Sequence, residues 1–211
     1  MRVIKLELGQ LQANCFLVID RLTDKALIID PGDEADFIIS KIQEEGIKPT
    51  AIIATHGHFD HVMAVNELKL AFEIPFWLSK MDVFLLKRIR SSAQYFAQTD
   101  PGPVPQANGY LNQADKADKI VFGKEKLTVI ETPGHTPGGI SLYSKKDKLV
   151  FTGDTLFAGG DIGRTDYSYG DSQVLEKSIK RILKLPKETI IYPGHGEKTT
   201  VEKERKIDGS R

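Results

Sequence analysis

Cysteine is nearly absent from this chain, which contains one, Cys15, among 211 residues. A single thiol cannot form a disulfide within the chain, and its apolar neighbours indicate a small buried side chain rather than a reactive thiol. No run of about 18 apolar residues occurs, so we expect no membrane span and no membrane partner. The first residues alternate polar and apolar and lack the apolar core of a signal peptide, which makes a cytoplasmic protein the default expectation.

Neither sign of charge is in excess, because 29 Lys and Arg residues balance 29 Asp and Glu residues. The general basic surface of nucleic-acid binders is therefore not expected, and we predict no nucleic-acid partner. Histidine is also scarce, with five in the chain, and all five stand where a metal ion could use them. Three lie in the segment His56-Gly57-His58-Phe59-Asp60-His61, and the others are His135 and His195, each directly after a glycine.

The hydrophobic pattern predicts short strands interleaved with helices. Strands are predicted at 3–8, 15–19, 26–29, 50–55, 74–78, 120–122, 127–131, 140–143, 149–152 and 189–192. Helices are predicted at 33–45, 62–72, 80–90 and 171–185. Strands in hairpin order mixed with helices indicate a layered α/β protein with mixed sheets, in two halves of similar plan.

Residues 91–118 predict a long loop, because they contain three prolines, two glycines and many polar side chains. A loop of this length in a compact domain is often functional. Two interpretations stay open: a functional loop, such as a lid over a site, and a disordered insertion.

The histidine-rich segment lies between a predicted buried strand and a predicted helix, where a rigid frame can hold ligands. His56 and His58 are two residues apart on an extended segment and can point the same way. Asp60 and His61 stand where the chain turns into the helix and can face a second ion. Imidazole suits zinc, iron or nickel, and a carboxylate among the ligands also permits manganese.

Three further candidates follow predicted strands elsewhere in the chain. Asp154 ends the segment Phe151-Thr152-Gly153-Asp154, although aspartate is also common in turns. His135 and His195 are each fixed by neighbouring prolines and glycines. An isolated histidine is more often a structural or surface residue, but the specific spacing His-x-His-x-Asp-His makes a metal role the better interpretation of the set.

The ordered set of His56, His58, Asp60, His61, His135, Asp154 and His195 resembles the metallo-β-lactamase superfamily over essentially the whole chain. Residues 132–138, 153–157 and 193–196 resemble its glyoxalase II (hydroxyacylglutathione hydrolase) branch. The resemblance implies a four-layer αβ/βα sandwich, with two mixed sheets flanked by helices. It also implies a single domain over residues 1–211, without the extra C-terminal helical region of glutathione-specific members. His56, His58 and His135 would bind one ion, Asp60, His61 and His195 a second, and Asp154 both.

The function implied is a dinuclear metal-dependent hydrolase that uses two divalent ions, zinc by preference and iron or manganese as alternatives. A hydroxide bridging the ions would attack a small thioester or ester, with Asp60 also orienting the nucleophile. The segment Gly160–Asp166 keeps the cation of a Gly-x-Gly-Arg/Lys pattern but lacks the aromatic residue expected after it. Arg164 is therefore a candidate ligand for a substrate carboxylate, or the partner of Asp161 or Asp166.

Two other functions are considered. An iron-dependent persulfide dioxygenase of the same fold would need one iron, two histidines and an aspartate, and the Gly163–Asp166 segment resembles such enzymes. A non-catalytic scaffold or regulatory domain is disfavoured, because members that lose catalysis usually lose ligands and this chain has all seven. The sequence leaves the oligomeric state open.

Overall fold

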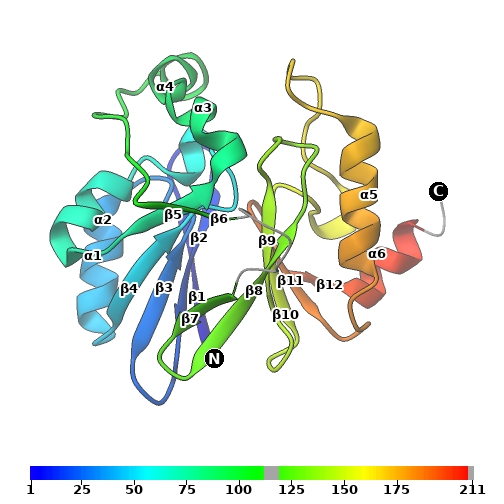
Figure 1. Cartoon of the computed structure of the whole chain (residues 1–211), viewed down its shortest axis with the longest axis horizontal. Coiled ribbons are helices and arrows are strands. Elements are labelled where there is room, and N and C mark those ends of the chain that lie inside the picture. Colours follow the sequence, from blue (N-terminus) through cyan, green and yellow to red (C-terminus); the bar gives the residue numbers. More distant parts are fainter. Residues whose placement is uncertain (112–118, 209–211) are drawn as a thin grey trace.

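The protein is described by a computed structural model covering residues 1–111 and 119–208, in which two six-stranded sheets face each other between outer helices (Figure 1). The first sheet has the order β1-β2-β3-β4-β5-β6 and the second the order β12-β11-β10-β9-β8-β7. Both sheets are mixed, since parallel pairs (β3 to β6 and β10 with β11) adjoin antiparallel pairs. The fold class predicted from the sequence is confirmed.

The strands and helices follow in chain order within each half. The first half contains β1 (Arg2–Leu8), β2 (Ala13–Ile19), β3 (Lys25–Ile29), α1 (Ala35–Glu44), β4 (Lys48–Ile53), α2 (Val65–Phe72), β5 (Phe76–Ser79), α3 (Val83–Leu86), α4 (Ile89–Ala97) and β6 (Gly109–Leu111). The second half contains β7 (Lys119–Phe122), β8 (Glu125–Glu131), β9 (Ile140–Ser144), β10 (Leu149–Gly153), α5 (Ser172–Leu183), β11 (Ile190–Pro193), β12 (Thr199–Thr200) and α6 (Val201–Asp208). Short 3₁₀ turns cover Phe59–His61, Lys80–Asp82 and Ala158–Gly160.

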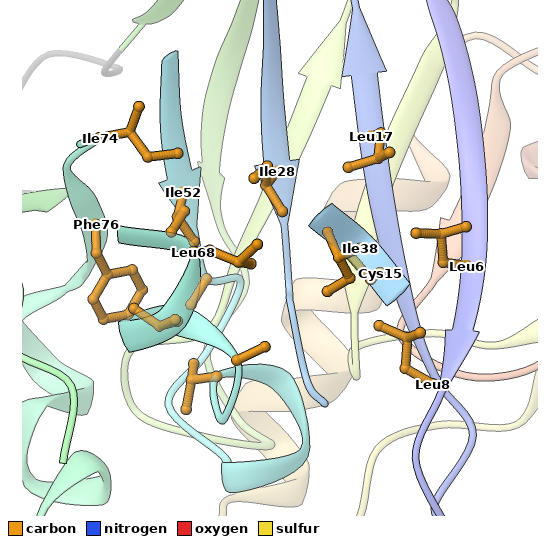
Figure 2. Close-up of a cluster of buried hydrophobic side chains, with 14 of the residues drawn as sticks. Leu6, Leu8, Cys15, Leu17, Ile28, Ile38, Ile52, Leu68, Ile74 and Phe76 are labelled. Carbon is orange, nitrogen blue, oxygen red and sulfur yellow. The ribbon is translucent and has the colours of Figure 1, made fainter. Parts of the chain in front are cut away.

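Three buried hydrophobic clusters fill the spaces between the four layers. One packs the first sheet against α1 and α2 (Figure 2), one lies between the sheets, and one packs the second sheet against α5 and α6. In β2 the alternate residues Cys15 and Leu17 enter the first cluster, whereas Phe16 and Val18 enter the second. A strand covered on both faces is mostly apolar, which explains the continuous hydrophobic run of β2 from Cys15 to Ile19.

Cys15 is fully buried, as predicted, and burial raises the pKa of its thiol well above the usual value. The buried residues of helix α5 follow the helical repeat: Leu175, Ile179 and Ile182 are three or four positions apart. Its first turn is capped by Asp171, whose carboxylate accepts a hydrogen bond from the Val174 amide. Among the described residues, no helix has the length and apolar character needed to cross a membrane.

The predicted loop over residues 91–118 is wrong in part. Helix α4 continues to Ala97 and β6 occupies Gly109–Leu111, while residues 112–118 lie outside the described residues. The hydrophobic pattern did not predict α4, because the buried face of this helix consists of Ile89, Ala93 and Ala97, and alanine contributes little to a hydrophobic pattern.

Other boundaries also differ from the predictions. The single helix predicted at 80–90 is divided into a 3₁₀ turn and α3, and the chain turns again before α4. The strand predicted at 50–55 ends at Ile53, because the Thr55 amide donates to the Asp30 carboxylate instead of joining the sheet. The charged tail from Glu197 contains β12 and α6, for which the sequence carried no strong pattern.

Candidate metal centre

The candidate ligands lie in loops that directly follow strands of both sheets. His56 to His61 follow β4, His135 follows β8, Asp154 follows β10 and His195 follows β11. The structure brings all seven into one cluster, because these loops meet at one edge of the sandwich. Strand ends held by two packed sheets can keep such side chains in fixed positions.

The three-histidine group (His56, His58 and His135) has its ligand atoms within 4.8 Å of one another. His58 Nδ1 lies 3.1 Å from His56 Nε2 and 3.0 Å from His135 Nε2. Nitrogen ligands of a tetrahedral ion, each about 2.0–2.1 Å from the metal, lie roughly 3.3 Å apart. The three nitrogens therefore have close to the mutual spacing that a shared metal ion requires.

The Asp60 group (Asp60, His61 and His195) also has its ligand atoms within 4.8 Å of one another. Asp60 Oδ2 lies 3.4 Å from His195 Nε2 and 3.8 Å from His61 Nε2. Asp154 lies between the two groups: its Oδ2 is 3.6 Å from His135 Nε2, and its Oδ1 is 3.5 Å from His61 Nε2. One carboxylate thus faces both groups.

Unsatisfied polar atoms within this cluster fit a bound cation. The Nε2 atom of His61 and the Oδ1 atom of Asp154 are buried and form no hydrogen bond with any described residue. Leaving a buried polar atom without a partner costs about 1–3 kcal/mol, more when the atom carries charge. A metal ion beside Asp154 and His61 would supply the missing interaction for the carboxylate oxygen and for His61 Nε2 together.

The electrostatic environment differs between the two groups. Burial, reinforced by His135, lowers the pKa of His58 to about 4, and burial with His61 lowers the pKa of His56 well below its usual value. Burial alone would also lower the pKa of His61, but Asp154 and Asp60 outweigh it and raise that pKa to about 10. His56 and His58 are thus neutral imidazoles at pH 7, whereas without metal His61 holds a proton that an ion would displace.

Asp60 remains ionised at neutral pH. Burial opposes its charge, but His61 and His195 outweigh burial and hold the pKa of Asp60 far below its usual value. The pKa of His195 is correspondingly raised, because the Asp60 hydrogen bond and Asp154 overcome the effect of burial. Asp60 is therefore an anion that can bind a cation or accept a hydrogen bond from water.

Each imidazole has a polar atom near the ring nitrogen that points away from the cluster. The distances are 3.1 Å from His56 Nδ1 to Thr55 Oγ1, 2.9 Å from His58 Nε2 to Tyr169 Oη, 3.3 Å from His61 Nδ1 to Asp30 Oδ2, 2.7 Å from His135 Nδ1 to the Arg164 carbonyl and 3.0 Å from His195 Nδ1 to the Leu11 carbonyl. Such outer contacts fix the orientation of metal-binding imidazoles.

Two buried aspartates that the sequence analysis did not select support the ligand loops. Asp30 follows β3, and its carboxylate accepts hydrogen bonds from the amide and the hydroxyl of Thr55, both at 2.6 Å. Asp82 accepts from the Gly57 amide at 3.0 Å, the Thr136 hydroxyl at 2.7 Å and the Gly138 amide at 2.6 Å. Asp82 therefore ties the His56–His58 segment to the loop that carries His135. Nothing in its sequence neighbourhood distinguished it from a surface aspartate.

Gly194 permits the close approach of the loops after β10 and β11. A Cβ atom at this position would lie 2.1 Å from Asp154 Oδ1 and 2.9 Å from His61 Cε1. Any larger residue would have to displace the Asp154 carboxylate. The glycine before His195 is thus a packing requirement of the cluster.

A cavity of about 390 Å³ opens beside the metal centre. His58, Asp60, His135, Asp154 and His195 reach it, and the rest of its wall is mainly apolar and aromatic, from Leu11, Phe59, Phe96, Phe157, Ile162, Tyr167 and Tyr169. The segment Gly160–Asp166 itself contains no aromatic residue, but the rings of Tyr167 and Tyr169, just after it, lie in this wall. They stand three and five residues after Arg164, so the sequence pattern of a cation directly followed by an aromatic does not include them.

Arg164 also reaches the cavity, but its Nε and Nη2 donate to the two carboxylate oxygens of Asp166 at 3.0 and 2.7 Å. Of the two ion-pair partners predicted for Arg164, Asp161 and Asp166, the structure shows Asp166.

Comparison with known proteins agrees with this geometry. The chain matches the family model "Metallo-beta-lactamase superfamily" over residues 8–195. It is 36% identical over 200 residues to "Hydroxyacylglutathione hydrolase GloC" of Haemophilus influenzae, covering 92% of this chain and 91% of the relative. The solved structure of "BLEG-1 B3 metallo-beta-lactamase" has a TM-score of 0.89 at 33% identity and covers 97% of both chains. That of "TTHA1623 in a di-iron-bound form" has a TM-score of 0.86 at 36% identity, covering 97% of this chain and 98% of the other.

Fold, ligand cluster and relatives together define, at the general level, a metal-dependent hydrolase. The chain belongs to the metallo-β-lactamase superfamily, which confirms the resemblance found in its sequence.

Proposed function

We propose that this protein is a dinuclear metal-dependent hydrolase acting on a small thioester of the hydroxyacylglutathione type, or on a related ester. The observation that carries the proposal is the Asp154 carboxylate, which faces His135 of one ligand group and His61 of the other. We assign the three-histidine group to one ion, the Asp60 group to a second, and Asp154 to both. The donors suit zinc, our first choice, and also iron or manganese. The di-iron relative supports iron as the alternative.

Two bound ions would supply a water acidified toward a pKa of about 7 and a Lewis acid for the substrate carbonyl. The remaining tasks fall to the residues of the chain. Asp60, anionic at neutral pH, can accept a hydrogen bond from the attacking water and so orient it. The leaving thiolate is stable without a proton, so a thioester places little demand on a general acid.

The cavity wall supports a substrate that is partly apolar. Aromatic rings such as Phe59, Phe96 and Tyr167 can pack against an acyl or thiol substituent. We propose that Arg164 binds a substrate carboxylate. Its pair with Asp166 is no obstacle, because both side chains are more than half exposed, and an exposed ion pair contributes only about 0–1 kcal/mol.

The test is metal content together with activity. Purified protein should contain two metal ions per chain and hydrolyse S-lactoylglutathione, with activity lost on chelation and restored by re-adding metal. His58→Ala should remove the ion of the three-histidine group and His195→Ala should weaken the other, so each variant should lose close to one ion per chain. Full thioesterase activity in chelated, metal-free protein would refute the proposal.

The alternative on the same fold is a mononuclear iron persulfide dioxygenase. That chemistry needs one ion, whereas the Asp60 group offers a complete second set of ligands. Oxygen uptake with glutathione persulfide, by protein holding one iron per chain and inactive on thioesters, would replace the hydrolase proposal with this one.

A further inference from the structure

The outer contact of His58 differs in kind from those of the other four imidazoles. The other partners are backbone carbonyls or side chains next to the sheets: Thr55, Asp30 and the carbonyls of Leu11 and Arg164. His58 instead contacts the hydroxyl of Tyr169, a residue of the cavity wall 111 positions away in the sequence. An outer-shell hydroxyl therefore lies in the same cavity that a substrate would enter.

The direction of this hydrogen bond follows from the geometry of the three-histidine group. His58 Nδ1 faces His56 Nε2 and His135 Nε2 at 3.0–3.1 Å, so Nδ1 is the nitrogen that a metal would take. A nitrogen that binds a metal carries no hydrogen, and in the neutral ring the hydrogen then resides on Nε2. His58 Nε2 accordingly donates to Tyr169 Oη over 2.9 Å.

The ring of Tyr169 is held firmly enough to place that oxygen. It stacks on Tyr167 with 5.2 Å between centroids and 12° between planes, and it meets the edge of Phe84 at 5.5 Å. Tyr167 in turn lies under the guanidinium of Arg164 at 5.0 Å. These contacts restrict the ring from two sides, so the hydroxyl is a preorganised acceptor rather than a mobile one.

We infer that Tyr169 is a positioning residue of the metal centre: its hydroxyl fixes the tautomer and ring orientation of His58 and thereby sets the affinity of the three-histidine group for its ion. This inference rests on the metal binding in the proposed function, and it names a determinant of that binding beyond the ligands. Loss of an outer contact to a metal-binding histidine typically costs about 10–100-fold in metal affinity or activity.

Tyr169→Phe tests the inference, because it removes one oxygen and keeps the ring in its stack. Tyr167→Phe is the matched control: it removes the same atom from the adjacent stacked ring, whose hydroxyl forms no hydrogen bond within residues 1–111 and 119–208. Zn²⁺ affinity is measured by chelator competition and the ligand field by the visible spectrum of the Co²⁺-loaded protein. The melting temperature of the metal-free protein reports any purely structural effect.

We expect Tyr169→Phe to lose about tenfold in affinity for one of its two ions, to change the Co²⁺ spectrum and to melt, metal-free, like the wild type. Tyr167→Phe should stay within about twofold of the wild-type affinity. Equal affinities in the two variants would overturn the inference. So would a loss in Tyr169→Phe that is matched by a lower melting temperature of the metal-free protein.

Experiments on the wild-type protein distinguish a failure of the proposed hydrolase function from a failure of the Tyr169 inference. Wild-type protein that binds metal but does not hydrolyse thioesters would refute the hydrolase and leave the comparison of the two variants readable. Wild-type protein that binds no divalent ion would refute both.

Discussion

Replacing Asp82 with alanine should destabilise the protein and weaken the three-histidine group at the same time. The side chain of Asp82 is fully buried, and its carboxylate accepts hydrogen bonds from Gly57, Thr136 and Gly138. Two of these donors are sequence neighbours of metal-facing histidines. Gly57 stands between His56 and His58, and Thr136 follows His135. Asp82→Ala would leave all three donors without their acceptor.

The magnitude follows from those three hydrogen bonds. A buried donor without a partner costs about 1–3 kcal/mol, so three would cost roughly 3–9 kcal/mol. Rotation of the Thr136 hydroxyl and entry of water into the vacated space reduce this to about 3–5 kcal/mol. For a chain of this size, the melting temperature should fall by about 10 °C. Affinity for the ion of the three-histidine group should fall by about 10–100-fold.

Glu204 provides a matched control in the same fold. It is also buried and accepts from the amides of Gly159 and Gly160 and from the Thr199 hydroxyl, but none of these neighbours a candidate ligand. Glu204→Ala should therefore lose similar stability and keep its metal affinity within about twofold of the wild type. Thermal melting and chelator competition on both variants measure the two effects. Equal changes in metal affinity, or wild-type stability in Asp82→Ala, would refute the reasoning.

Three further predictions concern protons and packing. Because the pKa of His61 is raised to about 10 without metal, ion binding at pH 7–8 should release one proton from His61, in addition to any proton lost by metal-bound water. Calorimetry in buffers of different ionisation enthalpy measures the total, which should be at least about one proton per chain. A total of zero would contradict the assignment of His61. The Thr23 hydroxyl and the amides of Leu22 and Lys124 lower the pKa of Asp20 from 3.8 to about 2. A carboxyl group whose pKa is lower in the folded state than in the unfolded state stabilises the fold when the pH is above the unfolded-state pKa. The contribution of Asp20 to folding stability should therefore be complete above about pH 4 and disappear as the pH falls through 2. Asp20→Asn should unfold more readily in denaturant at pH 7 and match the wild type near pH 2, and a difference that persists there would contradict this. The Cβ atom of Gly194→Ala would lie 2.1 Å from Asp154 Oδ1, so native mass spectrometry of this variant should find fewer than two ions per chain. Two ions bound with wild-type affinity would contradict this prediction, because they would show that the loop moves to accommodate the methyl group.

Much of the fold could be predicted because each layer imposes a local pattern. Strand β2 is buried at every position and apolar except at Asn14, since both faces are covered, and α5 repeats its buried residues every three or four positions. The prediction failed at α4, where alanines replace larger apolar residues, and at the end of β4, where Asp30 takes the Thr55 amide out of the sheet. That residues 1–211 form one domain, that the protein is cytoplasmic and that it binds no nucleic acid stay predictions.

The sequence by itself determined the candidate ligands, since histidine is rare here and the spacing His-x-His-x-Asp-His restricts which side chains can share an ion. Tertiary structure alone decided how those ligands are held. Asp30 and Asp82 each lie 25 residues from the backbone that they orient, and Tyr169 lies 111 residues from His58. Such contacts depend on strand order and on the packing of two sheets, which local sequence patterns do not encode, so the residues that support the metal centre became visible only in the folded chain.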